Sequence, residues 1–165
     1  MKRFEISALE VGGGQLALAR LPGSTGALAE DVRALADWGA ERVLSLTETE
    51  EQQGLGAEAL PEQLEAQGIA WMYFPIRDFD VPAPQQSEDW GALQQEILKA
   101  LGSGGRVLVH CRGGCGRSGM IVLRLMLACG EAPEDALQRL RAVRPCAVET
   151  DAQMRWATEG ALQQA

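Results

Sequence analysis

A ten-residue segment with the sequence HCRGGCGRSG, residues 110–119, combines reactive side chains with a flexible backbone. Its Cys111 and Arg117 are separated by five residues, and four glycines lie in the same segment. Because glycine tolerates unusual backbone angles, such a segment can curl until successive N–H groups point at one centre. A helix that follows adds unpaired N–H donors and the positive end of its dipole. The pattern therefore predicts an anion cradle, closed by the planar guanidinium of Arg117 around two phosphate oxygens.

Cys111 would lie at the bottom of this cradle. A thiol beside a helix N-terminus and an arginine has a pKa lowered from about 8.5, so we expect a thiolate at neutral pH. A thiolate that faces a phosphate monoester is positioned for in-line attack on phosphorus. The expected product of that attack is a cysteinyl-phosphate intermediate.

Other kinds of site fit these residues less well. A nucleotide-binding loop would have the pattern G-x-x-x-x-G-K-[ST], but Cys111 replaces its first glycine and Arg117 replaces its lysine. A zinc site would need a recognised ligand spacing, which His110, Cys111 and Cys115 do not form. A buried, purely structural cysteine is the alternative for Cys111 taken alone. No metal and no other cofactor is expected.

The elements around this segment alternate along the chain. Apolar or alternating runs predict strands at residues 4–10, 15–20, 42–46, 69–76 and 106–110. Helical spacing predicts helices at 25–39, 57–67, 90–101 and 118–129, and two more that begin at Pro133 and Thr150. The acidic run 48–51 indicates a solvated loop or a helix start. The alternation predicts an α/β fold of three layers with a central, mainly parallel sheet, which binds ligands at the carboxyl ends of its strands.

Length and charge limit the possible functions. The chain has 165 residues, so we expect one domain over residues 1–165. Its net charge of −8 argues against binding to nucleic acid or to an anionic membrane. No apolar stretch approaches the roughly 20 residues of a membrane span, and the N-terminus lacks the apolar region of a signal peptide. These features favour a cytoplasmic protein whose four cysteines are thiols.

Three motifs resemble those of a known family. The segment 110–119 is similar to H-C-x-x-G-x-G-R-[ST]-G, the signature loop of the cysteine-dependent protein tyrosine phosphatases. Residues 75–82, PIRDFDVP, resemble the P-I-x-D-x-x-x-P segment that carries the general acid in the subgroup like cyclin-dependent kinase inhibitor 3 phosphatase. Residues 144–153, RPCAVETDAQ, are similar to the downstream segment of that subgroup, which ends in a glutamine. The resemblance implies the three-layer fold of dual-specificity phosphatases.

The resemblance also implies residue roles. Asp78 would donate a proton to the leaving group and then activate the hydrolytic water, while Ser118 would donate a hydrogen bond to the departing sulfur of Cys111. His110 would order the loop, and Gln153 would position the water. The phosphate oxygens would be held by Arg117 and the rest of the loop, namely Arg112, Gly113, Gly114, Cys115 and Gly116.

Several of these assignments have alternatives in the sequence. Asp80 could be the acid, although the spacing to the flanking prolines favours Asp78. Gln153 also forms a capping-box pattern with Thr150 at the start of the last helix. Cys115 could form a disulfide with Cys111 under oxidation and protect the nucleophile, or it could simply be a variable position. The remaining two cysteines, Cys129 and Cys146, are interpreted as structural.

The function that these motifs predict is hydrolysis of phosphotyrosine, with phosphoserine and phosphothreonine as further candidate substrates. A phosphoinositide or inositol-phosphate phosphatase on the same scaffold is an alternative, and so is a phosphate-binding module without turnover. Sulfur transfer and arsenate reduction also use a cysteine in an anion-binding loop. Sulfur transfer would leave Asp78 without a role. Small arsenate reductases carry this loop near the N-terminus, whereas here it begins at residue 110. The expected partner is a phosphorylated protein or a small phosphomonoester. The sequence does not indicate an oligomeric state.

Overall fold

The computed structural model describes residues 3–162, with side chains for residues 3–159. Strands and helices alternate along most of this range, as the sequence predicts. The strands are β1 (Ser7–Val11), β2 (Gly14–Ala19), β3 (Arg42–Ser45), β4 (Ala70–Tyr73) and β5 (Arg106–His110). The helices are α1 (Leu28–Trp38), α2 (Thr49–Gly54), α3 (Leu60–Ala66), the 3₁₀ turn η1 (Pro84–Gln86), α4 (Ser87–Gly102), α5 (Gly116–Ala128), α6 (Pro133–Val143) and α7 (Asp151–Leu162).

The five strands form one mixed sheet in the order β1-β2-β5-β3-β4. Only the edge strand β1 is antiparallel to its neighbour, while β2, β5, β3 and β4 run parallel. The central strand β5 is fully buried at residues 107–110, which explains its unbroken apolar sequence. The predicted α/β fold with a mainly parallel sheet is therefore confirmed.

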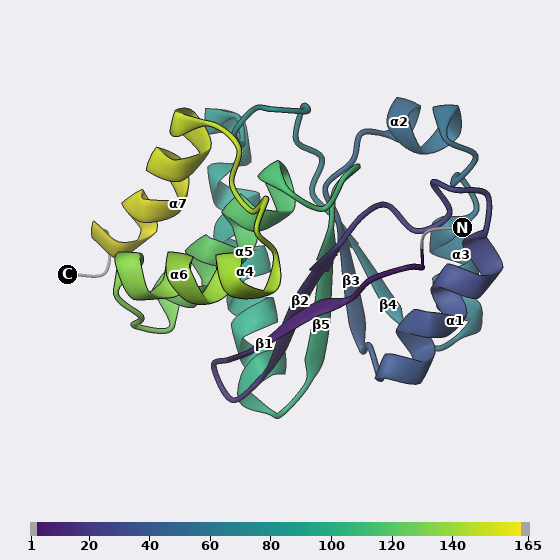
Figure 1. Ribbon diagram of the computed structural model, residues 1–165, viewed down its shortest axis with the longest axis horizontal. Helices are drawn as coiled ribbons and strands as arrows, with labels where there is room; N and C mark the ends of the chain where they lie inside the picture. Colours follow the sequence, from purple (N-terminus) through teal and green to yellow (C-terminus); the bar gives the residue numbers. More distant parts are fainter. Residues whose placement is uncertain (1–2, 163–165) are drawn as a thin grey trace.

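Helices cover both faces of the sheet (Figure 1). On one face, α1 and α3 pack on side chains such as Val43 and Leu108. On the other face, α4, α5, α6 and α7 pack on Leu16, Val107 and Val109. Because the four parallel strands point the same way, the segments that follow them meet at one edge of the sheet, where parallel sheets bind ligands.

Helix α5 is buried from its first residue to Leu127, which agrees with a sequence that is apolar apart from Arg117, Ser118 and Arg124. Gly119 allows this depth, because a Cβ atom there would lie 2.6 Å from the backbone nitrogen of Val148. The helix begins two residues earlier than the sequence predicts, with Cys115 as its N-cap. Arg117 and Ser118 therefore belong to its first turn.

Several boundaries differ from the sequence prediction. The first strand begins at Ser7 instead of residue 4, and the third helix begins at Leu60 instead of residue 57. Strand β4 ends at Tyr73, but the N–H groups of Phe74 and Ile76 still donate to β3 and its continuation, so the chain follows β3 as far as Ile76. Pro75 interrupts the regular ladder because it has no N–H to donate.

No helix within residues 3–162 is long and apolar enough to cross a membrane.

Candidate active site

The loop that follows β5 forms a pocket with the segment that follows β4 and with Glu149, which lies just before α7. The pocket has a volume of about 390 Å³. Its lining combines the predicted nucleophile and acid with an aromatic ring, and consists of Asp78, Phe79, Cys111, Arg112, Gly113, Cys115 and Glu149. The structure thus brings Asp78 and Cys111 together, although they are far apart in the sequence.

The loop between β5 and α5 is fastened by its carbonyl groups. Leu21 donates its N–H to the carbonyl of Arg112 at 3.1 Å. Arg144 donates from Nη2 to Gly113 and from Nε to Gly114, both at 2.9 Å. In a planar trans peptide the N–H points opposite to the C=O, so the N–H groups of the next residues are turned away from these partners. This is the arrangement that an anion cradle requires.

Gly114 makes this path of the loop possible. Its φ of +76° lies in the left-handed region, which favours glycine. A Cβ atom at this position would also lie 2.5 Å from the backbone carbon of Ala19 and 2.6 Å from the nitrogen of Arg20. The loop therefore packs directly against the end of β2.

The sulfur of Cys111 lies at the floor of the pocket, and the residue is only 3% exposed. Its Sγ is 3.2 Å from Oγ of Ser118, which lies in the first turn of α5. The first-turn N–H groups of α5 have no acceptors within the helix, so they add positive potential near this sulfur. The predicted pairing of Cys111 with Ser118 is present.

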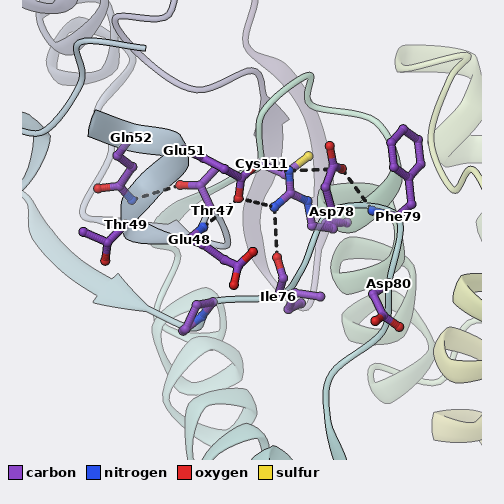
Figure 2. A network of polar contacts seen from close by, with 12 residues as sticks. Thr47, Glu48, Thr49, Glu51, Gln52, Ile76, Asp78, Phe79, Asp80 and Cys111 are labelled. Carbon is purple, nitrogen blue, oxygen red and sulfur yellow. Dashed lines mark hydrogen bonds and ion pairs between the residues drawn. The ribbon is translucent and has the colours of Figure 1, made fainter. Parts of the chain in front are cut away.

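Arg117 is 1% exposed, and its guanidinium is held on several sides by Glu51, Ile76 and Asp78. Figure 2 labels these three partners. Glu51 accepts from both terminal nitrogens at 2.8 Å, and the carbonyl of Ile76 accepts from Nη1 at 2.9 Å. Asp78 contributes a carboxylate oxygen 3.2 Å from Nη2. Within residues 3–162, the Nε atom of Arg117 has no hydrogen-bond acceptor. This nitrogen is thus available for an anion in the loop.

The opposite charges of Glu51 and Arg117 stabilise each other. Burial by itself raises the pKa of Glu51, but hydrogen bonds from Arg117 and the backbone of Glu48 outweigh it and hold the pKa below the usual 4.5. Burial lowers the pKa of Arg117, yet its contacts with Glu51 and the charges of Cys111 and Asp78 raise it overall. Glu51 and Arg117 are therefore both ionised near neutral pH.

His110 is fully buried behind the loop. Burial lowers its pKa to about 4, so the ring is neutral at physiological pH. Its Nδ1 lies 3.2 Å from the carbonyl of Cys111, which can only accept, so Nδ1 carries the proton. Nε2 then accepts from the hydroxyl of Ser45, whose oxygen accepts in turn from Nε1 of Trp71 at 2.8 Å. This chain orients the ring and fixes the carbonyl of the Cys111 peptide.

The two candidate acids lie differently. Asp78 lines the pocket and contacts Arg117, and it accepts the N–H of Phe79 at 3.0 Å. The carboxylate of Asp80 accepts the N–H of Val81 at 2.8 Å and points away from Cys111 in Figure 2. The geometry favours Asp78 as the acid, in agreement with its spacing from the prolines.

Gln153 adopts the capping arrangement that the sequence offers as its alternative. Its N–H donates to Oγ1 of Thr150 at 3.0 Å, while its side-chain oxygen accepts the N–H groups of Glu149 and Thr150. Its Nε2 donates to the carbonyl of Asp80 at 3.3 Å. The side chain of Gln153 therefore connects the start of α7 to the segment that carries Asp78 and Asp80. Its role in positioning water stays a prediction.

The prediction that all four cysteines are thiols is wrong for two of them. Cys115 and Cys146 form a disulfide, with Cα atoms 5.1 Å apart. The N–H of Val148 donates to the carbonyl of Cys115, so the segment that carries Cys146 runs beside the loop. Cys111, the partner that the sequence suggests for Cys115, is free and buried. Cys129 is also free, but it is exposed after the end of α5 and has no place in the core.

Several residues of the site escape the sequence analysis, among them Glu51, Phe79 and Glu149, which lines the pocket. Glu51 belongs to the acidic run that we expected to be solvated or to begin a helix; α2 does begin there, but Glu51 turns inward to Arg117. Phe79 is 62% exposed beside the pocket and has a φ of +63°, an unusual conformation for an aromatic residue. Two features of the sequence point to Glu51 and Phe79 as part of the site. Glu51 lies just beyond the end of a parallel strand, and Phe79 lies between two aspartates.

We expect the Glu51→Gln substitution to lower the free energy of unfolding by about 3 kcal/mol, because it leaves a buried guanidinium with only the more distant and more exposed Asp78 as a counter-charge. Since the folded pKa of Glu51 is lowered, its contribution is fully present above pH 4.5 and is lost as the pH falls through the folded pKa. Urea denaturation above and below pH 4.5 measures both effects. Glu50→Gln, at an exposed position of the same helix, is the control. Equal losses in the two variants would contradict the structural role of Glu51.

We expect Cys146→Ser to lower the free energy of unfolding by about 2–4 kcal/mol, because the disulfide restricts the unfolded chain. Denaturation with and without a reducing agent measures this effect. Cys129→Ser removes an exposed thiol and should leave stability nearly unchanged. A wild-type protein that loses no stability on reduction would contradict the disulfide.

Comparisons with known proteins find phosphatase domains that are similar to this chain. A family model with the description "PTP-SAK: Swiss Army Knife protein, DSP-PTPase phosphatase domain" matches residues 18–157. The structure of kinase associated phosphatase with its catalytic-site cysteine replaced by serine matches with a TM-score of 0.86 and 23% identity, over 99% of this chain and 97% of that one. Tk-PTP in its active form matches with a TM-score of 0.74 and 30% identity, over 95% of this chain and 97% of that one.

A viral protein shares a shorter segment. "Putative tyrosine phosphatase 067L" of Invertebrate iridescent virus 3 is 38% identical over 53 residues, which are 32% of this chain and 22% of the viral protein. The match therefore spans only about a fifth of that relative. The family model covers most of this chain, however, and the likeness to Tk-PTP extends over nearly all of it. By these matches, the chain belongs to the family of dual-specificity protein tyrosine phosphatases.

Proposed function

We propose that this protein hydrolyses phosphotyrosine in proteins through a cysteinyl-phosphate intermediate, with phosphoserine and phosphothreonine as further substrates. The observation that carries the proposal is that Cys111 and Asp78 line the same pocket. Arg117 contacts Asp78 and is held in place by Glu51. The chain contains the nucleophile, the acid and the anion-binding groups together, so a phosphate-binding module without turnover is the weaker explanation.

The phosphate would bind in the cradle. Its oxygens would accept hydrogen bonds from the loop N–H groups and from Nε of Arg117, which has no acceptor within the described part of the chain. Charge accumulates on these equatorial oxygens in the transition state, so pre-oriented donors stabilise the transition state more than the free substrate. The cost of orienting Arg117 is met during folding, because Glu51 and Ile76 already hold it.

In the first step, the thiolate of Cys111 attacks phosphorus and the bond from phosphorus to the tyrosine oxygen breaks. Asp78, in its protonated form, gives its proton to that oxygen, so tyrosine leaves as a neutral phenol. In the second step, water attacks the phosphorus and Asp78 takes its proton. The bond between sulfur and phosphorus then breaks, and Ser118 donates a hydrogen bond to the departing thiolate from 3.2 Å.

Phe79 supports a preference for an aromatic leaving group. Its side chain is exposed at the pocket that Cys111 and Asp78 also line. A phenyl ring bound with its phosphate on the loop could pack on this side chain, whereas the shorter phosphoserine side chain would gain less contact.

We also propose a cytoplasmic location. In that compartment thiols are kept mostly reduced, so Cys115 and Cys146 would exchange between the disulfide and the dithiol form. Counting free thiols in protein extracted under alkylating conditions tests this point. An intact disulfide in all of the extracted protein would contradict a reducing location.

We expect Cys111→Ser to abolish turnover of a phosphotyrosyl peptide, because a serine hydroxyl at this site is a far weaker nucleophile than a thiolate. The variant should still bind tungstate, because the cradle consists of backbone N–H groups and Arg117. Initial rates and calorimetric titration measure the two properties, and Cys129→Ser serves as the control. Retained turnover in the Cys111→Ser variant would refute the proposed function.

We expect Asp78→Ala to lower kcat by about 100-fold for phenyl phosphate and much less for para-nitrophenyl phosphate, whose leaving group needs little protonation. The ratio of the two rates isolates the acid from other effects of the substitution. Asp80→Ala, two residues away, is the matched control and should leave the ratio unchanged. If Asp80→Ala changes the ratio and Asp78→Ala does not, Asp80 is the acid.

A further inference from the structure

Strand β4 lies at one edge of the sheet (Figure 1). The N–H groups of Ala70 and Phe74 point to the β3 side, where each donates to a carbonyl at 3.0 Å. Since the backbone groups of a strand alternate in direction, the N–H and C=O groups of Trp71 and Tyr73 point away from β3. Within residues 3–162, β4 pairs with β3 alone. The outward groups therefore form an open edge, which can pair with one more strand.

The two residues with outward backbone groups also carry exposed aromatic rings. Alternation along the strand places both rings on one face, where they stack with centroids 5.2 Å apart. Trp71 and Tyr73 are each 37% exposed. The hydroxyl of Tyr73 lies 3.2 Å from Oγ1 of Thr49, which connects the stack to the start of α2. Exposed aromatic faces of this kind bind cations, and guanidinium groups more often than ammonium groups.

The chain around this edge is strongly acidic. Residues 41–70 run from β3 through α2 and α3 to β4, and their charged residues are seven glutamates and one arginine. The segment thus carries a net charge of −6, compared with −8 for the whole chain. In the described part of the chain, Glu51 is the one glutamate of this segment that forms an ion pair. The β4 edge therefore attracts lysine and arginine side chains.

We propose that a basic, extended segment of the phosphorylated protein substrate adds to the sheet along β4 and places its lysine or arginine side chains on the stack of Trp71 and Tyr73. This inference rests on the proposed function, because it assigns the docked segment to the substrate. Backbone hydrogen bonds to the edge would supply affinity, and contacts of the cationic side chains would supply selectivity.

The position of β4 relative to the active site sets the spacing within the substrate. The strand continues into the segment that carries Asp78, which follows Tyr73 by five residues. Five residues span at most about 18 Å, so a phosphotyrosine about five to ten residues from the basic segment would reach the pocket of Cys111.

A second copy of this chain fits the edge less well than a basic peptide. Two copies joined through β4 would bring two segments of charge −6 together, and their repulsion would oppose the pairing. A basic peptide gains from the same charge, because it neutralises part of it. The charge thus favours the substrate segment over self-association.

The test compares kcat/KM for two phosphotyrosyl peptides with the spacing given above. One carries an arginine-rich segment, and the other carries glutamine in place of each arginine. We expect the arginine segment to raise kcat/KM by about tenfold through a lower KM, and we expect added salt to reduce this gain. A proline in the middle of the arginine segment should remove most of the gain, because proline has no N–H to donate to the edge.

Variants of the edge provide the matched controls. Tyr73→Ala removes half of the aromatic stack, and Glu50→Gln combined with Glu62→Gln removes two exposed charges from α2 and α3. Both variants should reduce the gain and leave turnover of para-nitrophenyl phosphate unchanged, because none of these residues lines the active-site pocket. Glu134→Gln combined with Asp135→Asn makes the same charge change at exposed positions of α6 and should leave the gain unchanged.

Calorimetric titration of the wild type with the arginine segment alone, without phosphotyrosine, separates this inference from the proposed function. If phosphotyrosyl peptides are hydrolysed but the arginine segment changes neither rate nor binding, docking at β4 is overturned and the proposed function stands. A gain that survives the proline, or that survives both edge variants, also overturns the added strand. Self-association that Tyr73→Ala abolishes overturns the substrate as the occupant. If the segment binds but no phosphotyrosyl peptide is hydrolysed, the proposed function fails, and the docked segment does not belong to its substrate.

Discussion

The ion pair between Glu51 and Arg117 is the interaction on which the site depends. A guanidinium with 1% exposure needs a counter-charge, and Glu51 supplies one through two hydrogen bonds of 2.8 Å. The pair joins α2 to α5, and the carbonyl of Ile76 adds the segment after β4. Three elements that are separate in the sequence therefore meet at one side chain. An arginine without these partners would have to be oriented by the substrate itself, at a cost in binding energy.

The parallel sheet makes this meeting possible. Strands β2, β5, β3 and β4 all end at the same edge, so each contributes its following segment to the site. The loop after β5 supplies the sulfur and its cradle, and the segment after β4 supplies Asp78 and Phe79. The chain after β3 supplies Glu51, and the chain after β2 closes the loop through Leu21. The chemistry thus depends on backbone topology as much as on the signature residues.

Features that depend on local sequence were predictable, and features that depend on distant partners were not. The glycines, Cys111, Arg117 and Ser118 lie within one short segment, and periodic apolar residues located the strands and helices around it. Glu51 lies 66 residues from Arg117, and no local pattern indicates which member of an acidic run will turn inward. Sequence alone also does not determine which cysteines pair, so the partner of Cys115 emerged only from the packing of residues 146–148 against the loop. The capping pattern of Gln153 was visible, but its bond to the carbonyl of Asp80 required the tertiary structure.

The bond between Cys115 and Cys146 closes a covalent ring that contains α5 and α6. Backbone cleavage in the turn between these helices, around the exposed Gly130, would open the ring. The two fragments of the chain would stay joined through the disulfide. The nicked chain would migrate at full mass in a non-reducing gel and divide into fragments only after reduction. The stretch of chain that carries the predicted nucleophile would thereby remain attached to α7 even after a protease had cut the polypeptide between them.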